Sequence, residues 1–112
     1  MDTTSSKAVM QVIDEMKNRI VERFNPVKII LFGSFAKDSF GPDSDIDLLV
    51  IMDIEGSKRN KAAEIDLLLS ERNMPLDVIV VTPEEFVRYR DIVGHIIYPA
   101  AHEGRILYER AA

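Results

Sequence analysis

The chain has 112 residues, a length typical of one folded domain, and its 46% apolar content is that of an ordinary globular protein. A net charge of −5, with Lys and Arg scattered along the chain, argues against direct nucleic-acid binding. The sequence has no cysteine, no apolar run of 18 residues and no recognisable secretory signal, so we expect a cytoplasmic protein without disulfides, thiolate sites or a membrane span.

Helical and extended patterns alternate along the chain. Residues 5–24 place apolar side chains at helical spacing and are followed by Asn25-Pro26, which predicts an amphipathic helix that ends there. Short runs rich in β-branched residues predict strands at 27–32, 45–52, 76–81 and 106–108, and further helices are expected over 34–39, 57–72 and from 83 to about 103. This order predicts a single α/β domain spanning residues 1–112.

Several residues predict where helices begin and end. Ser57 is expected to cap the helix that follows it, and Thr82-Pro83-Glu84-Glu85 combines a Thr cap, a Pro at the first helical position and a Glu placed for a capping box. Pro99 is expected to kink or break the last helical segment, and Gly104 suits the residue after a helix end.

Two carboxylates, Asp45 and Asp47, lie two residues apart at the start of a predicted strand. Because side chains alternate along a strand, both carboxylates share a face, with Cβ atoms about 6–7 Å apart. A third, Asp77, lies near the start of another apolar strand and joins them if the two strands pair. Three gathered carboxylates repel one another, and Mg²⁺, which binds one or two carboxylates together with substrate phosphates, relieves the repulsion. The pattern therefore favours a metal site.

The alternative interpretation is structural, because Asp at a strand end is a common turn former. However, Asp47 directly precedes the run Leu-Leu-Val-Ile, where a charge is costly unless another group compensates it. The matching position of Asp77 makes the metal interpretation the favoured one.

Gly33 and Ser34 follow the predicted strand 27–32. If a helix starts there, it presents backbone N–H groups and a positive helix end, the glycine allows phosphate to approach and the serine hydroxyl can donate to it. The pair alone is also an ordinary turn. Its separation from Asp45 is enough for a short helix and a loop, so the phosphate cradle and the carboxylates are expected at neighbouring strand ends.

The stretch GSFAKDSFGPDSDIDLLV resembles the signature of the DNA polymerase β-like nucleotidyltransferase superfamily, and is most similar to its minimal nucleotidyltransferase (MNT) group. LDVIVV matches the position of the third carboxylate, and HEGRILYE is similar to the usual MNT ending, so the resemblance spans roughly residues 7–110. It implies the polymerase β-like fold, a mixed sheet of about four strands flanked by helices.

The resemblance also implies the site. Asp45 and Asp47 would hold two Mg²⁺ ions, with Asp77 as third ligand that helps activate the acceptor hydroxyl, while Gly33 and Ser34 would contact the phosphates of a nucleoside triphosphate, expected to be ATP. Attack on the α-phosphorus would release pyrophosphate. Many relatives read Ala-Arg-Gly where this chain has Ala36-Lys37-Asp38, so Lys37 can meet phosphate only as a point charge.

Other residues are given simpler interpretations. Arg90 and His95 match the R-x4-H pattern of HEPN ribonucleases, which we attribute to chance, and both His95 and His102 are expected on C-terminal helices. Lys58, Arg59 and Lys61 suggest a solvated helix face. The apolar residues of this region suggest core packing or, alternatively, a partner-binding surface: Phe86, Tyr89, Ile92, Ile96 and Ile97.

At this length we expect no room for the acceptor-holding second domain that the resemblance associates with larger relatives. The acceptor must then be held by a partner chain, a homo-oligomer mate or the acceptor macromolecule itself. The MNT resemblance implies an antitoxin that adds AMP to a tyrosine of an all-helical HEPN toxin. Two alternatives stay open: an antitoxin that neutralises its partner by contact alone, and a nucleotidyltransferase that modifies a small molecule such as an aminoglycoside.

Overall fold

The computed structural model describes residues 6–37, 39–41, 43–71 and 74–111. In chain order the elements are α1 (Ser6–Phe24), β1 (Lys28–Phe32), β2 (Ile46–Ile51), α2 (Lys58–Leu68), β3 (Leu76–Val81), α3 (Pro83–Tyr89), α4 (Ile97–Glu103) and β4 (Arg105–Glu109). This order confirms the predicted succession of elements, apart from the helix expected over 34–39. None of the described helices is both long and apolar enough to cross a membrane.

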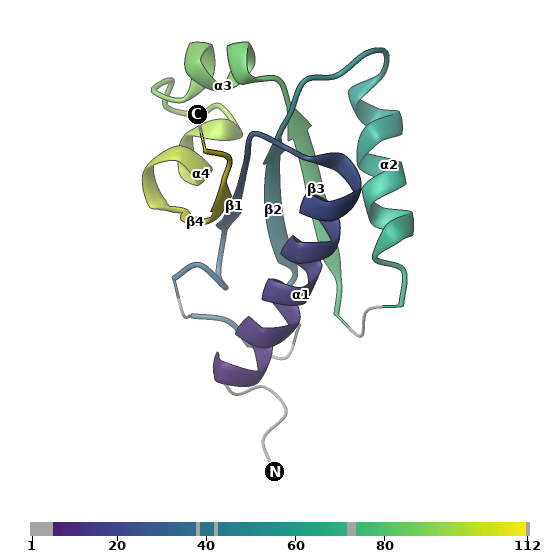
Figure 1. Ribbon diagram of the computed structural model, residues 1–112. Coiled ribbons are helices and arrows are strands. Elements are labelled where there is room, and N and C mark those ends of the chain that lie inside the picture. Colours follow the sequence, from purple (N-terminus) through teal and green to yellow (C-terminus); the bar gives the residue numbers. More distant parts are fainter. Residues whose placement is uncertain (1–5, 38, 42, 72–73, 112) are drawn as a thin grey trace.

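The four strands form one mixed sheet in the order β3-β2-β1-β4. β1 runs antiparallel to both β2 and β4, whereas β2 and β3 are parallel. As Figure 1 shows, β2 and β3 both point toward the end of the sheet where α3 begins. The mixed α/β architecture with four strands, expected from the family resemblance, is confirmed.

Helices cover both faces of the sheet, and each face has its own apolar core. On one face, α1 and α2 bury Ile13, Ile20 and Ile65 against alternate strand residues such as Leu48. On the other, α3 and α4 bury Phe86 and Ile97 against the intervening residues of β1 and β2, as well as Val81 of β3. This alternation explains why the strand runs are apolar on nearly every residue: both of their sides are buried.

The segment after β1 differs from the prediction. Residues 34–37 form a turn, in which the Ala36 N–H donates to the Gly33 carbonyl (3.1 Å) and the Lys37 N–H donates to the Ser34 carbonyl (3.2 Å), rather than the helix expected over 34–39. The Phe35 side chain is 2% exposed in the core under α1 and stacks on Phe40, with ring centroids 4.5 Å apart. This anchor ties the turn to the loop that leads to β2.

Pro99 does not kink or break a helix, so that prediction is wrong. The break lies earlier, between the end of α3 at Tyr89 and the start of α4 at Ile97. Pro99 stands in the first turn of α4, where its missing N–H has no intrahelical acceptor to lose. Gly104 follows α4, as expected, but in an extended conformation with φ −80° and ψ 169°.

The predicted helix starts are confirmed. Ser57 caps α2 by accepting from the Asn60 N–H, although α2 ends at Leu68, earlier than the predicted 72. The hydroxyl of Thr82 accepts from the Glu85 N–H (3.1 Å), and the Glu85 carboxylate accepts from the Thr82 N–H (2.9 Å), which completes the capping box of α3.

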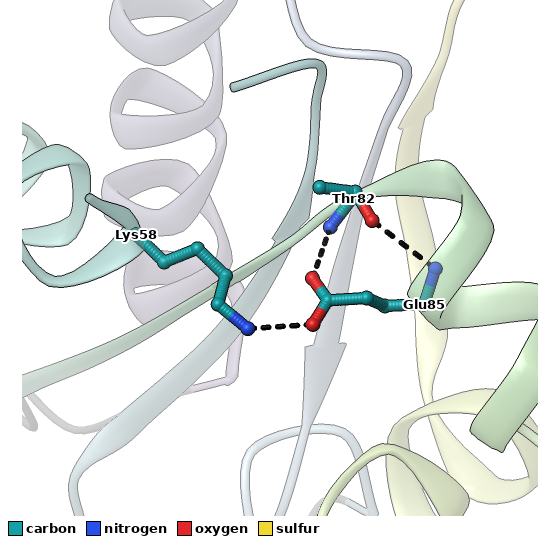
Figure 2. Close-up of polar contacts among 3 residues, drawn as sticks. All are labelled: Lys58, Thr82 and Glu85. Carbon is teal, nitrogen blue, oxygen red and sulfur yellow. Dashed lines mark hydrogen bonds and ion pairs between the residues drawn. The ribbon is translucent and has the colours of Figure 1, made fainter. Parts of the chain in front are cut away.

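The basic residues at the start of α2 are more than a solvated helix face. The ammonium group of Lys58 donates to the second Glu85 oxygen at 2.5 Å, so one carboxylate links the starts of α2 and α3 (Figure 2). Lys61 pairs with Glu64 at 3.3 Å.

Some apolar residues of the C-terminal region pack in the core, as the first interpretation expects, and others are partly exposed, as a partner-binding surface would require. Phe86 and Ile97 belong to the core, whereas Ile92 and Ile96 are about half exposed, at 49% and 55%. Tyr89 packs at the edge of the core and stacks on His95, with ring centroids 4.4 Å apart.

His95 lies between α3 and α4, so the expectation that it belongs to a helix is wrong, whereas His102 lies on α4 as expected.

Candidate active site

The sheet register brings two of the predicted carboxylates together. Asp47 is the second residue of β2 and Asp77 the second residue of β3, and the two are direct partners in the parallel pair. The Ile46 N–H donates to the Pro75 carbonyl at 2.9 Å, which fixes this register where the strands begin. Both aspartates alternate with residues of the α1 and α2 core, so their side chains lie on the face that α3 and α4 cover farther along the strands.

Asp45 lies one residue before β2 and is exposed. The preceding loop folds on itself, because the Gly41 N–H donates to the Ser44 hydroxyl (2.9 Å) and the Ser44 N–H donates to the Gly41 carbonyl (3.1 Å). Asp45 therefore stands between these contacts and β2, two residues before Asp47.

Among the residues that the structure describes, no cation pairs with the acidic cluster of Asp45, Asp47 and Asp77. Burial raises the pKa of the Asp47 carboxyl above its ordinary value, and the charges of Asp77 and Asp45 raise this pKa further. The charges of Asp45 and Asp77 therefore act on Asp47 in the same direction as its burial.

Gly33 lies against the Asp47 carboxylate. Phe32, the last residue of β1, is the direct partner of Asp47 in the antiparallel pair, so Gly33 follows at the same end of the sheet. Gly33 has φ +75°, and a Cβ built on it would lie within 2.3 Å of the nearer Asp47 carboxylate oxygen. A side chain at this position would displace the carboxylate, so glycine serves the acidic cluster as well as the turn.

Ser34 and Lys37 occupy the turn after Gly33. The Ser34 carbonyl closes the turn by accepting from the N–H groups of Lys37 (3.2 Å) and Ser39 (3.0 Å). The ammonium group of Lys37 lies 3.4 Å from the Glu103 carboxylate at the end of α4, and both side chains are 51% exposed. Asp38, the other departure from the family pattern, lies outside the described residues.

The donor set fits Mg²⁺ in its usual binding mode. Asp47 and Asp77 offer adjacent carboxylates, Asp45 contributes a third charge, and the pKa of Asp47 is raised by burial and by repulsion from both neighbours, costs that a bound divalent cation would offset. Within the residues that the structure describes, no three acidic or histidine side chains are gathered closely enough to hold a metal by themselves. Mg²⁺ commonly completes its octahedron with water and substrate phosphates.

The predicted site residues thus lie at one end of the sheet, around the last residue of β1 and the first residues of β2 and β3. Sequence reasoning missed Glu103, whose partner Lys37 is far away in the sequence. No local pattern could have found this pair, because it depends on how α4 returns to β1.

Comparisons with known proteins define the class. The model of the nucleotidyltransferase domain family matches residues 13–99, most of the chain. The chain belongs to this family and is a nucleotidyltransferase.

The relatives are of similar size. The chain is 31% identical over 105 residues to the "Putative protein adenylyltransferase MJ0604" of Methanocaldococcus jannaschii, covering 91% of this chain and 96% of that protein. Among solved structures, a "putative nucleotidyltransferase" from Sulfolobus solfataricus superimposes with a TM-score of 0.59 at 19% identity, covering 94% of this chain and 84% of the other. A toxin–antitoxin structure with AMP-PNP gives a TM-score of 0.51 at 19% identity, covering 87% and 73%. These two likenesses confirm the fold.

Proposed function

We propose that this nucleotidyltransferase transfers AMP from ATP, with Mg²⁺ bound by Asp45, Asp47 and Asp77, to a tyrosine hydroxyl of a HEPN-type partner protein, and thereby acts as an antitoxin. The observation that carries the proposal is the pairing of Asp47 with Asp77 beside Gly33. The M. jannaschii relative named as a protein adenylyltransferase supports the choice of AMP and of a protein acceptor.

The arrangement assigns a task to each group. Asp45 and Asp47 hold the metal, while the turn at Gly33 and Ser34, with Lys37, faces the triphosphate. Mg²⁺ ions supply charge stabilisation for the oxygens that enter and leave the α-phosphorus. The tyrosine oxygen forms a bond to the α-phosphorus, the bond from that phosphorus to the pyrophosphate oxygen breaks, and pyrophosphate leaves. Asp77, exposed on the edge strand β3, would be the third metal ligand and would help to activate the hydroxyl by accepting its proton.

The experiment is incubation of the purified chain with ATP labelled at the α-phosphate and Mg²⁺, with and without the protein encoded by the neighbouring gene. The expected result is label on a tyrosine of that protein, lost in Asp47→Asn and retained in Asp53→Asn. Asp53 is exposed beyond the far end of β2, so its variant removes the same charge away from the site.

Two other outcomes contradict the proposal in distinct ways. If an Asp45→Asn/Asp47→Asn double variant still neutralises the partner, the chain acts by contact alone. If the purified chain labels an aminoglycoside but never the protein, the acceptor is a small molecule.

A further inference from the structure

The ion pair between Lys37 and Glu103 joins two parts of the fold that the sequence keeps far apart. Lys37 ends the turn beside the acidic cluster, and Glu103 is the last residue of α4. The Glu103 carboxylate oxygen lies 3.4 Å from the ammonium nitrogen of Lys37. Glu103 therefore pairs with the cation that the proposed function assigns to the triphosphate.

The close packing of α4 on β1 fixes the position of Glu103. A Cβ on Gly104 would lie 2.4 Å from the Ala100 carbonyl oxygen, 2.5 Å from the Ile30 side chain and 3.0 Å from the Leu31 carbonyl oxygen. Only glycine lets the chain come this near to β1. The end of α4 is thereby held beside the end of β1, where the turn with Lys37 begins.

The stability of α4 does not explain an acidic residue at this position. The C-terminal end of a helix carries partial negative charge, so a carboxylate there is unfavourable and a cation is favourable. An ion pair with both side chains 51% exposed adds little stability, typically up to about 1 kcal/mol.

We propose that Glu103 tunes nucleotide affinity by competing with the triphosphate for Lys37. This inference rests on the proposed function, because it takes the turn to be where the triphosphate lies. In the free protein Lys37 pairs with Glu103; when nucleotide binds, the ammonium group exchanges that carboxylate for a phosphate oxygen. Glu103 is then a positioning residue that weakens nucleotide binding and contacts no reacting atom.

The test is a double-mutant cycle in the full chain, with Mg²⁺ and AMP-PNP as the probe and calorimetry as the measurement. At low salt we expect Glu103→Gln to lower the Kd by about two- to fivefold, the range of an exposed ion pair. In a Lys37→Met background the same change is expected to have no effect. In turnover assays, Glu103→Gln is expected to lower KM and leave kcat unchanged, and the gain in affinity should shrink as salt rises.

Glu109→Gln is the matched control. Glu109 pairs with Lys28 at 3.2 Å at the other end of β1, and its side chain is 58% exposed, so the variant removes a similar ion pair and the same charge away from the site. Its Kd should equal that of the wild type. Equal tightening in both variants, or tightening by Glu103→Gln that persists without Lys37, indicates a general charge effect and overturns the inference.

The remaining outcomes separate the two proposals. If the wild type binds AMP-PNP and Glu103→Gln leaves the Kd unchanged or raises it, the competition is refuted and the proposed function stands. If the wild type binds no nucleotide with Mg²⁺, the proposed function fails, and the inference fails with it.

Discussion

The two ends of β3 arrange their charges in opposite ways. Where the strand begins, Asp77 lies beside Asp47, and the pKa of Asp47 is raised by burial and by its acidic neighbours. Where it ends, Glu85 is held by Lys58 and by the Thr82 cap (Figure 2), and hydrogen bonds from these two residues lower its pKa. Glu85 is thus paired with a cation, whereas the charged neighbours that act on Asp47 are acidic.

The carboxylates at the two ends of β3 therefore have different roles, one structural and the other functional. The Lys58–Glu85–Thr82 contacts satisfy a helix start and stabilise the fold. The Asp45–Asp47–Asp77 cluster costs stability in the metal-free protein, which is typical of a site that a ligand completes. Removing the charge of Asp47 or of Glu85 should therefore affect stability with opposite signs, and only the acidic end should affect transfer.

The largest effect is expected from Asp47→Asn. Loss of this charge should lower transfer by about 10²–10³-fold, as for removal of a principal electrostatic group of an active site. The same variant should unfold at a slightly higher temperature without metal, because it removes like-charge repulsion. Radiolabel transfer and thermal melts in EDTA measure the two effects. A variant that is less stable than the wild type contradicts the picture of an uncompensated cluster.

Gly33→Ala should come next, with a loss of about 10²-fold in transfer if the carboxylate moves by about 1 Å. The added Cβ meets the Asp47 carboxylate, and the positive φ costs about 1–2 kcal/mol for a residue with a side chain. Gly94→Ala is the control, since Gly94 has φ +94° and a Cβ added there would meet no atom within 4 Å. It should lose stability alone. Equal transfer by both variants would refute the role of Gly33 at Asp47.

At the other end of β3, Thr82→Ala should lower the free energy of unfolding by about 1 kcal/mol through loss of the α3 cap. In a chain of this size that corresponds to a midpoint lower by about 4 °C. Transfer should be unchanged at temperatures where the variant is folded. Thermal melts followed by circular dichroism, with labelling at 25 °C, test this; a matching loss of transfer would show that the two ends are coupled.

The pH dependence of stability gives the smallest and sharpest contrast. Because folding raises the pKa of Asp47, this residue favours the folded state at pH values below its ordinary pKa of 3.8. That contribution is lost as the pH rises through the raised pKa. Because folding lowers the pKa of Glu85, this residue stabilises the folded state at pH values above its ordinary pKa of 4.5. That contribution is lost as the pH falls through the lowered pKa.

Melts of metal-free protein between pH 3 and 7 should therefore diverge. As pH rises, Asp47→Asn should gain stability relative to the wild type, while Glu85→Gln should lose it. Parallel curves for the two variants would remove the distinction between the two ends.

Local chemistry explains which predictions from sequence succeeded. The capping box of α3 depends on residues three apart, and the position of Asp77 opposite Asp47 follows from two strands that each begin with one apolar residue and an aspartate. The turn after Gly33 was mistaken for a helix because the anchoring of Phe35 against α1 and Phe40 is a tertiary contact.

The directions of the strands also could not be predicted from local sequence patterns. Gly33, at the carboxyl end of β1, meets the aspartates at the amino ends of β2 and β3 because β1 runs antiparallel to β2, which the spacing between Gly33 and Asp45 allowed but did not require. Pro99 was misjudged for a similar reason: whether a proline breaks a helix or occupies its first turn depends on where the helix starts.

The pairing of β1 with β4 has a consequence for how the chain is made. The fourth strand, Arg105–Glu109, supplies the outer neighbour of β1, so a growing polypeptide leaves that apolar strand with an open edge until β4 has left the ribosome. Contacts between such distant segments form slowly. A nascent chain halted before β4 should be prone to pair with other chains, and synthesis of β4 should be what closes this edge.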